Sequence, residues 1–163
     1  MAEDLLSHPD LKENLRELLT EEIAAFFLGN TAPDVQVISG QRREETHFFQ
    51  VPVEPGAILP WEQMIRHYQS LANGRRLPPH QAAFIIGWMC HLQADWYWVR
   101  NIFTPIFGYH ASWGDFASRL YLHNVLRSYL DLKVHQRMNG KISGSLRQAQ
   151  PEMWLPFVKD EHL

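Results

Sequence analysis

An apolar stretch from Ala82 to Trp98 constrains the fold more than any other part of this sequence, because it carries His91 and Asp95 four residues apart. Residues four apart on a helix lie on the same face, one turn above the other, so these two side chains would stack. Inside an otherwise apolar helix they cannot simply face water, and an unpaired buried polar group is costly. They must be paired or bound to something, and a divalent metal ion is one partner that would satisfy both.

We expect this stretch to form the central, buried helix of an all-α fold. Residues 82–90 are apolar almost all round, which is typical of a helix covered on every side. Pro78-Pro79 just before it is a favourable helix start. Apolar periodicity and the positions of Pro, Gly and Asn predict four helices, over Asp10–Leu28, Trp61–Ala72, His80–Val99 and Trp113–Asn139.

The ends of these helices follow from local signals. Gly29 is expected to end the first helix in a left-handed turn, and Ser112 to cap the last one. Pro105 and Gly108 are expected to break the segment between the third and fourth helices. The tail after residue 140 is poorly patterned, so no element is predicted there.

The segment Thr31–Pro60 is rich in Pro and Gly and is predicted to be a long loop. Short strands over Val35–Ile38 and His47–Val51 are conceivable but too short to be well supported. The chain has 163 residues and 45% hydrophobic residues, enough for one domain with its own core. We therefore expect a single helical bundle over residues 1–163, with this loop as its irregular part.

Composition excludes several classes of protein. The formal charge is −3 with no Lys/Arg block, which argues against nucleic-acid binding as the main function. Cys90 is the one cysteine, so no intramolecular disulfide can form, and its apolar surroundings favour a buried, inert thiol. No secretory signal and no apolar run long enough to cross a bilayer are seen, so a cytoplasmic location is expected. The sequence does not indicate an oligomeric state.

A metal site can be assembled from two parts of the chain. Zinc-type sites use His nitrogen and carboxylate oxygen, with three or four protein ligands. His91 and Asp95 come from the central helix, and Asp34 in N-T-A-P-D and His47 in E-T-H-F-F come from the loop. The alternative is a purely structural arrangement, in which His91 pairs with Asp95, Asp34 caps a turn, and His47 packs among phenylalanines. Spacing alone leaves both open.

The segments LGNTAPDV, ETHFFQVP and AAFIIGWMCHLQADWYW, in that order, resemble the zinc-dependent phospholipase C family. Asp34, Thr46-His47 and the spacing Gly87-x-x-x-His91-x-x-x-Asp95 carry the resemblance. It implies a helical phosphoesterase in which Asp34, His47, His91 and Asp95 hold Zn²⁺. The donor types would also accept Mn, Fe or Ni.

The sequence also departs from the family pattern, in which active relatives hold a three-metal cluster. The family uses its N-terminal residue as a ligand, whereas this chain has Met1. Asn101 stands near the place of a further ligand His, and His123 is followed by Arg127 where a Glu completes the family's last pair. The resemblance thus implies one intact metal site and two that are damaged or rebuilt. A variant with fewer metals and a non-catalytic relative both remain open.

The last predicted helix carries polar residues at four-residue spacing: Asp115, Arg119, His123, Arg127, Asp131 and His135. One interpretation is a row of ion pairs on an exposed face, worth a few tenths of a kcal/mol each. The other is that His123 and Asp131 approach the metal site, with the fork of Arg127 available to a phosphate.

The leading functional hypothesis is metal-dependent hydrolysis of a small-molecule or lipid phosphate ester. The metal would lower the pKa of a bound water toward about 7 and so provide the nucleophile. Asp34 or Asp95 could accept the proton, and His123 is a further candidate catalytic residue. The metal and Arg127 would stabilise charge on the phosphoryl oxygens. The alternative is a non-catalytic helical module that binds a structural metal or a protein partner.

Overall fold

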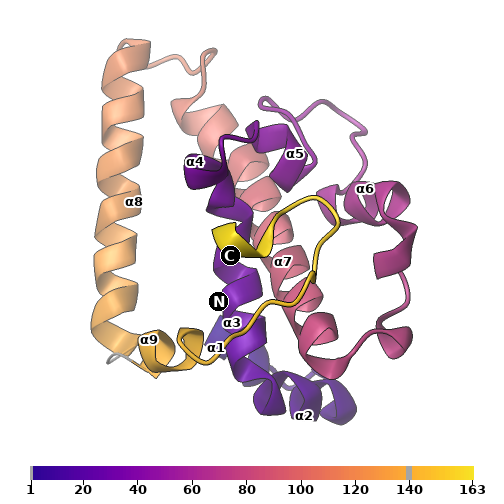
Figure 1. Ribbon diagram of the computed structural model, residues 1–163. Helices are drawn as coiled ribbons and strands as arrows, with labels where there is room; N and C mark the ends of the chain where they lie inside the picture. The colour runs from indigo at the N-terminus through magenta and orange to yellow at the C-terminus, as the bar shows by residue number, and fades with distance from the viewer. Residues whose placement is uncertain (1, 139–140) are drawn as a thin grey trace.

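The computed structural model describes residues 2–138 and 141–163, and this part of the chain is all-α without a strand (Figure 1). The α-helices are α1 (Ala2–Leu6), α2 (Glu13–Glu21), α3 (Ile23–Thr31), α4 (Gln36–Ser39), α5 (Arg43–His47), α6 (Pro60–His67), α7 (Pro79–Trp98), α8 (Phe116–Met138) and α9 (Lys141–Leu146). Short turns are η1 (Ala32–Val35), η2 (Gln69–Leu71), η3 (Gly74–Arg76) and η5 (Asp160–His162), and η4 (Val99–Phe107) is a π-helix. None of the described helices combines the length and hydropathy needed to cross a membrane.

Helices α3 and α7 make the most extensive helix–helix contact in the described part of the chain. They cross at two glycines, Gly29 and Gly87, where the two backbones touch. A Cβ atom on Gly29 would collide with the carbonyl oxygen of Phe84, and one on Gly87 would collide with that of Phe26. The Cβ on Gly87 would also lie 3.0 Å from the Cα of Gly29. Only glycine therefore allows this approach.

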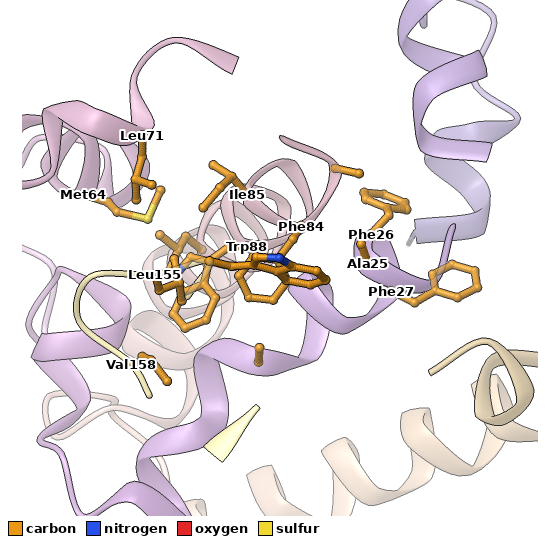
Figure 2. Packing of buried hydrophobic residues seen from close by; sticks show 14 of the residues in the cluster. Ala25, Phe26, Phe27, Met64, Leu71, Phe84, Ile85, Trp88, Leu155 and Val158 are labelled. Carbon is orange, nitrogen blue, oxygen red and sulfur yellow. The ribbon is translucent and has the colours of Figure 1, made fainter. Parts of the chain in front are cut away.

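The core is built around Trp88, which is fully buried on α7 (Figure 2). Phe26 of α3 and Met64 of α6 are also fully buried and belong to the same cluster. The indole nitrogen of Trp88 donates to the carbonyl of Thr46 at 3.2 Å. This bond ties the core to the segment just before His47.

The C-terminal tail closes the core on one side. Trp154, Leu155 and Val158 are buried in the main cluster, although their segment showed no helical or strand pattern. The side-chain amide of Gln81 donates to the carbonyl of Trp154 at 2.9 Å, and that of Gln41 donates to the carbonyl of Phe157 at 2.8 Å. Irregular backbone is thus held by amide side chains from other parts of the fold.

The long helix α8 stands beside the rest of the molecule (Figure 1). Its main contact is with η4, near its own N-terminal end, and α9 then returns the chain to α3. Arg119 and His123 are buried polar residues of this helix. Farther along, Tyr129 and Leu132 are more than half exposed. Helix α8 is therefore attached mainly at one end.

The central helix and the all-α class were predicted correctly, since α7 spans Pro79–Trp98. The prediction that Gly29 ends a helix was wrong, because α3 continues to Thr31 and Gly29 lies at its close contact with α7. The predicted first helix is also divided, since Glu22 leaves helical geometry between α2 and α3 (φ −101°, ψ 36°).

Three other local expectations differ from the structure. Neither segment considered as a strand is one: Val35–Ile38 lies in η1 and α4, while His47 ends α5 and residues 48–51 form neither helix nor strand. The first half of the long loop therefore contains short helices. Helix α8 is capped by Asp115 and not by Ser112: the Asp115 Oδ1 accepts from the backbone N–H of Ser118 at 2.9 Å. Pro105 does not break the chain either, because η4 continues through it and ends only at Phe107.

We predict that Gly87→Ala destabilises the fold by about 1–3 kcal/mol, the usual range for overpacking. The added methyl group has no room at the crossing of α3 and α7. Urea unfolding of the two proteins would measure the difference. Gly144→Ala in α9 is the matched control, because its added methyl group would meet nothing within 4 Å. That change should be neutral or stabilise by up to about 1 kcal/mol. Equal unfolding curves for the wild type and Gly87→Ala would contradict the glycine contact.

Candidate metal centre

Asp34, His47 and His91 come together from three elements, η1, α5 and α7. Each residue offers one ligand atom, and these three atoms lie within 4.8 Å of one another. The His47 side chain is 1% exposed, while that of Asp34 is 60% exposed. The His47 Nε2 lies 3.5 Å from the Asp34 Oδ1. Three of the four ligands predicted from the sequence therefore form one cluster.

The orientation of His91 is fixed by α3. The His91 Nδ1 lies 2.9 Å from the carbonyl oxygen of Asn30, which can only accept a hydrogen bond. The ring therefore carries its proton on Nδ1, and Nε2 keeps a lone pair. A ligating histidine typically donates its other ring N–H to a backbone carbonyl in this way.

Thr46 holds His47 in a similar manner. The Thr46 hydroxyl donates to the carbonyl of Arg43 at 3.2 Å and lies 2.9 Å from the His47 Nδ1. The hydroxyl can accept from Nδ1 or donate to it, according to which ring nitrogen of His47 carries the proton. Either way the ring is held with Nε2 facing Asp34, where it can donate its N–H to the carboxylate or, once deprotonated, offer a lone pair to a metal ion.

Both Asp34 and His91 have pKa values suited to metal binding. The hydrogen bond from His47 is the main cause that lowers the Asp34 pKa to about 2, against the opposing effect of burial. Burial lowers the pKa of His91 below its ordinary value, although the carbonyl of Asn30 opposes this. At neutral pH the carboxyl group is thus ionised and the His91 imidazole is neutral, the forms in which each binds a metal.

The donor set fits a zinc-type ion. Two imidazole nitrogens and one carboxylate converge, and without a cation or proton between them these electron-rich groups would repel one another. Three protein ligands of the His/His/carboxylate type are characteristic of catalytic zinc sites. Asp34, His47 and His91 are the residues that would hold the ion.

Asp95 lies beside this cluster and is paired with Arg43. Its Oδ2 is 3.8 Å from the His47 Nε2, and the same oxygen accepts from the Arg43 Nη2 in an ion pair. The sequence analysis grouped Asp95 with the three donors as a fourth ligand. In the structure it lies outside their cluster, lines the same cavity and is paired with a guanidinium.

A cavity of about 770 Å³ opens over the cluster. The candidate ligands Asp34, His47, His91 and Asp95 line one side of it. Residues of α8 line it too, namely His123, Arg127, Leu130 and Asp131. Trp98 and Phe103 are among its apolar lining residues. The long helix is thus one wall of the cavity.

His123 lies in an aromatic environment. Its Nε2 accepts a hydrogen bond from the Trp98 indole at 2.9 Å, and its ring centroid is 4.9 Å from that of Phe103 and 5.2 Å from that of Phe107. An indole N–H can only donate, so the neutral His123 ring carries its proton on Nδ1. Burial, followed by the charge of Arg127, lowers the His123 pKa. His123 therefore anchors α8 as a neutral group.

One member of the polar row on α8, Arg119, is bound to backbone carbonyls instead of a carboxylate. Arg119 is buried and donates to the carbonyls of Tyr109, Trp113 and Gly114, at 3.1, 2.7 and 2.8 Å. The ion-pair interpretation is therefore wrong for Arg119. The second interpretation, that part of the row faces the candidate site, agrees with His123, Arg127 and Asp131 lining the cavity.

Sequence reasoning missed Arg43 and Asn30. Arg43 stands four residues before His47, so the two share one face of α5, but this spacing is visible only once the segment is known to be helical. Asn30 acts through its backbone carbonyl, which leaves no signal in residue type. Cys90 is half-buried where full burial was expected, and burial raises its thiol pKa to about 11, as an unreactive thiol requires.

A family model described as zinc dependent phospholipase C matches residues 1–159 of the 163-residue chain. No curated protein and no solved structure matches the chain. The match covers the three clustered donors, Asp95 and the whole of α8.

We predict that the purified protein contains about one zinc ion per chain, because three converging donors form one site. The double change His91→Ala and Asp95→Ala should abolish binding, as measured by elemental analysis. Removing zinc from the wild type with a chelator should lower the melting temperature by several degrees, since a ligand bound only to the folded state stabilises it. Zinc content that is unaffected by the double change would contradict the assignment.

We also predict that His123 makes the fold less stable in mild acid. Its pKa in the folded protein is below the ordinary value of 6.5. The unfolded chain therefore takes up the proton first as the pH falls. The stability that the fold gains from neutral His123 is present above about pH 6.5 and is lost as the pH falls below that value. Protonation of Nε2 would also break the hydrogen bond with Trp98, because two N–H groups would then face each other.

The test compares unfolding free energies of the wild type and His123→Gln between pH 5 and pH 8. Glutamine keeps a hydrogen-bond acceptor for Trp98 but does not titrate in this range. The wild type should lose more stability toward low pH than the variant. Parallel pH profiles would show that protonation of His123 is not coupled to folding.

Proposed function

This chain belongs to the zinc-dependent phospholipase C family, and we propose that it is a zinc-dependent hydrolase of phosphate esters. The observation that carries the proposal is the convergence of Asp34, His47 and His91 within 4.8 Å at a cavity of about 770 Å³. Such a cavity is in the size range of small-molecule sites. Small-molecule and lipid phosphoesters are the proposed substrate classes.

Asp34, His47 and His91 are the proposed zinc ligands, with Asp95 as a fourth ligand or as the proton acceptor. Zinc, when bound, supplies a Lewis acid that activates water and polarises a phosphoryl oxygen. The chain's own residues then need to orient the substrate and receive a proton.

Asp95 is the favoured proton acceptor. The low pKa of Asp34 makes its carboxylate a good ligand but a weak base. Asp95 pairs with Arg43 through Oδ2, which leaves Oδ1 as the second oxygen of the carboxylate. We propose that this oxygen takes the proton of the attacking water.

His123 and Arg127 are the proposed contributions of α8. His123 keeps its proton on Nδ1, because Nε2 accepts from Trp98, so it would act as a hydrogen-bond donor to the leaving group and not as a base. Arg127 lines the same cavity and carries a permanent charge that can pair with a phosphoryl oxygen. Both residues would stabilise negative charge that develops during hydrolysis.

The second candidate function is a non-catalytic interaction module with the family fold. The observation that favours it is the exposure of apolar side chains on α8, since Tyr121, Val125, Tyr129 and Leu132 are 46–68% exposed. Exposed apolar surface of this kind is common at protein contacts. This alternative would leave the zinc ion structural.

We predict weak hydrolysis of an activated aryl phosphate ester that is lost in Asp95→Asn. Asparagine preserves the shape of the side chain but cannot serve as the proposed base. Zinc-loaded wild type and variant would be assayed with phosphomonoester and phosphodiester substrates, and zinc content would be measured for both. Equal rates at equal zinc content on every substrate would favour the interaction module.

A further inference from the structure

Arg43 is a charged residue of the cavity that the proposed ligand set does not use. It begins α5, and its guanidinium lies between two fixed groups. The Nη2 forms an ion pair with Asp95, and the guanidinium carbon lies 4.6 Å from the centre of the Phe49 ring. A guanidinium that is both paired and stacked is held in one orientation.

One terminal nitrogen of this guanidinium has no hydrogen-bond partner in the described part of the chain. The Arg43 Nη1 is buried and makes no hydrogen bond within the described residues. An unsatisfied buried donor is unfavourable, and more so when it is charged. Because Arg43 lines the cavity beside Asp34, His47 and His91, an anion bound there could supply the missing acceptor.

Arg127 provides a second positive charge in the same cavity, from α8. The cavity thus joins three metal donors with two guanidinium groups that come from different elements, α5 and α8. Arginine matches the paired oxygens of a phosphate better than other cationic side chains do. This combination of groups suits an anion with several oxygens, such as a phosphate.

Resting on the proposed hydrolase function, we propose that Arg43 binds a phosphoryl oxygen of the substrate, as a fixed cation beside the metal donors. Asp95 and Phe49 position the guanidinium, and the unpaired Nη1 donates to the phosphate. The ligand is a phosphate group, either as a monoester or as a diester. Arg43 would then set specificity for phosphate over uncharged esters.

The test is calorimetric titration of the zinc-loaded protein with inorganic phosphate and, separately, with dimethyl phosphate. The first probe represents a dianionic group and the second a diester. Four proteins are compared: the wild type, Arg43→Ala, Arg43→Lys and Arg42→Ala. Zinc content and melting temperature are measured for each one.

Arg42→Ala is the matched control. Arg42 has the same charge, adjoins Arg43 in the chain, and has a side chain that is 78% exposed and paired with Glu45. Its loss should leave phosphate affinity within about twofold, because an exposed charge acts weakly through solvent. Arg43→Ala should bind whichever of the two probes the wild type binds with an affinity at least about tenfold lower, as expected for a lost charge-assisted hydrogen bond. Arg43→Lys should lie between, since it keeps the charge without the fork.

The outcomes separate the inference from the function on which it rests. Wild-type phosphate affinity in zinc-loaded Arg43→Ala would overturn the role of Arg43 and leave the hydrolase proposal intact. Loss of zinc from both Arg43 variants would show that Arg43 supports the metal donors, and this result would also overturn its role in phosphate binding. A wild type that binds neither zinc nor phosphate would overturn the proposed function itself. If Arg43→Ala does not fold, Arg43→Lys decides: weaker phosphate binding with zinc retained supports the role, and wild-type affinity overturns it.

Discussion

The crossing of α3 and α7 at Gly29 and Gly87 is the contact on which the candidate site depends. With no Cβ on either residue, the two backbones touch, and the carbonyl of Asn30, next in the chain to Gly29, comes within 2.9 Å of the His91 ring. His91 lies one turn after Gly87 on the same face of α7, and Asp95 lies one turn further. The spacing Gly-x-x-x-His-x-x-x-Asp thus has a physical meaning: close packing, then a ligand held by the facing helix, then a carboxylate beside it.

The core and the site are joined through Trp88. It is fully buried, yet its indole N–H is used by the carbonyl of Thr46, whose hydroxyl in turn orients His47. A change in the packing of α7 would therefore reach His47 through two hydrogen bonds. Rigid support of this kind is what keeps ligand atoms in place before a metal binds.

How much could be predicted from the sequence depended on how strongly each residue signals its environment. The central helix followed from an apolar run that can only be buried. Residue types and spacing left Asp34, His47 and His91 open between a metal site and a structural arrangement, and only the ordered resemblance to a family favoured the cluster that the structure contains. The glycine at position 29 was misread because Gly serves both helix ends and close helix contacts, and only the partner helix decides between them. Arg43 was missed because its segment is too short and polar to show helical periodicity.

The charges that line the cavity link metal binding to phosphate binding. Asp34, Asp95 and Asp131 line it together with Arg43 and Arg127, so with neutral imidazoles the lining carries one net negative charge. A lining with net negative charge disfavours binding of an anion. A divalent cation held by Asp34, His47 and His91 would make the net charge of the cavity positive. The guanidiniums of Arg43 and Arg127 would then attract an anion together with the metal. Because coupling between two ligands is reciprocal, phosphate in the cavity must tighten metal binding by the same factor.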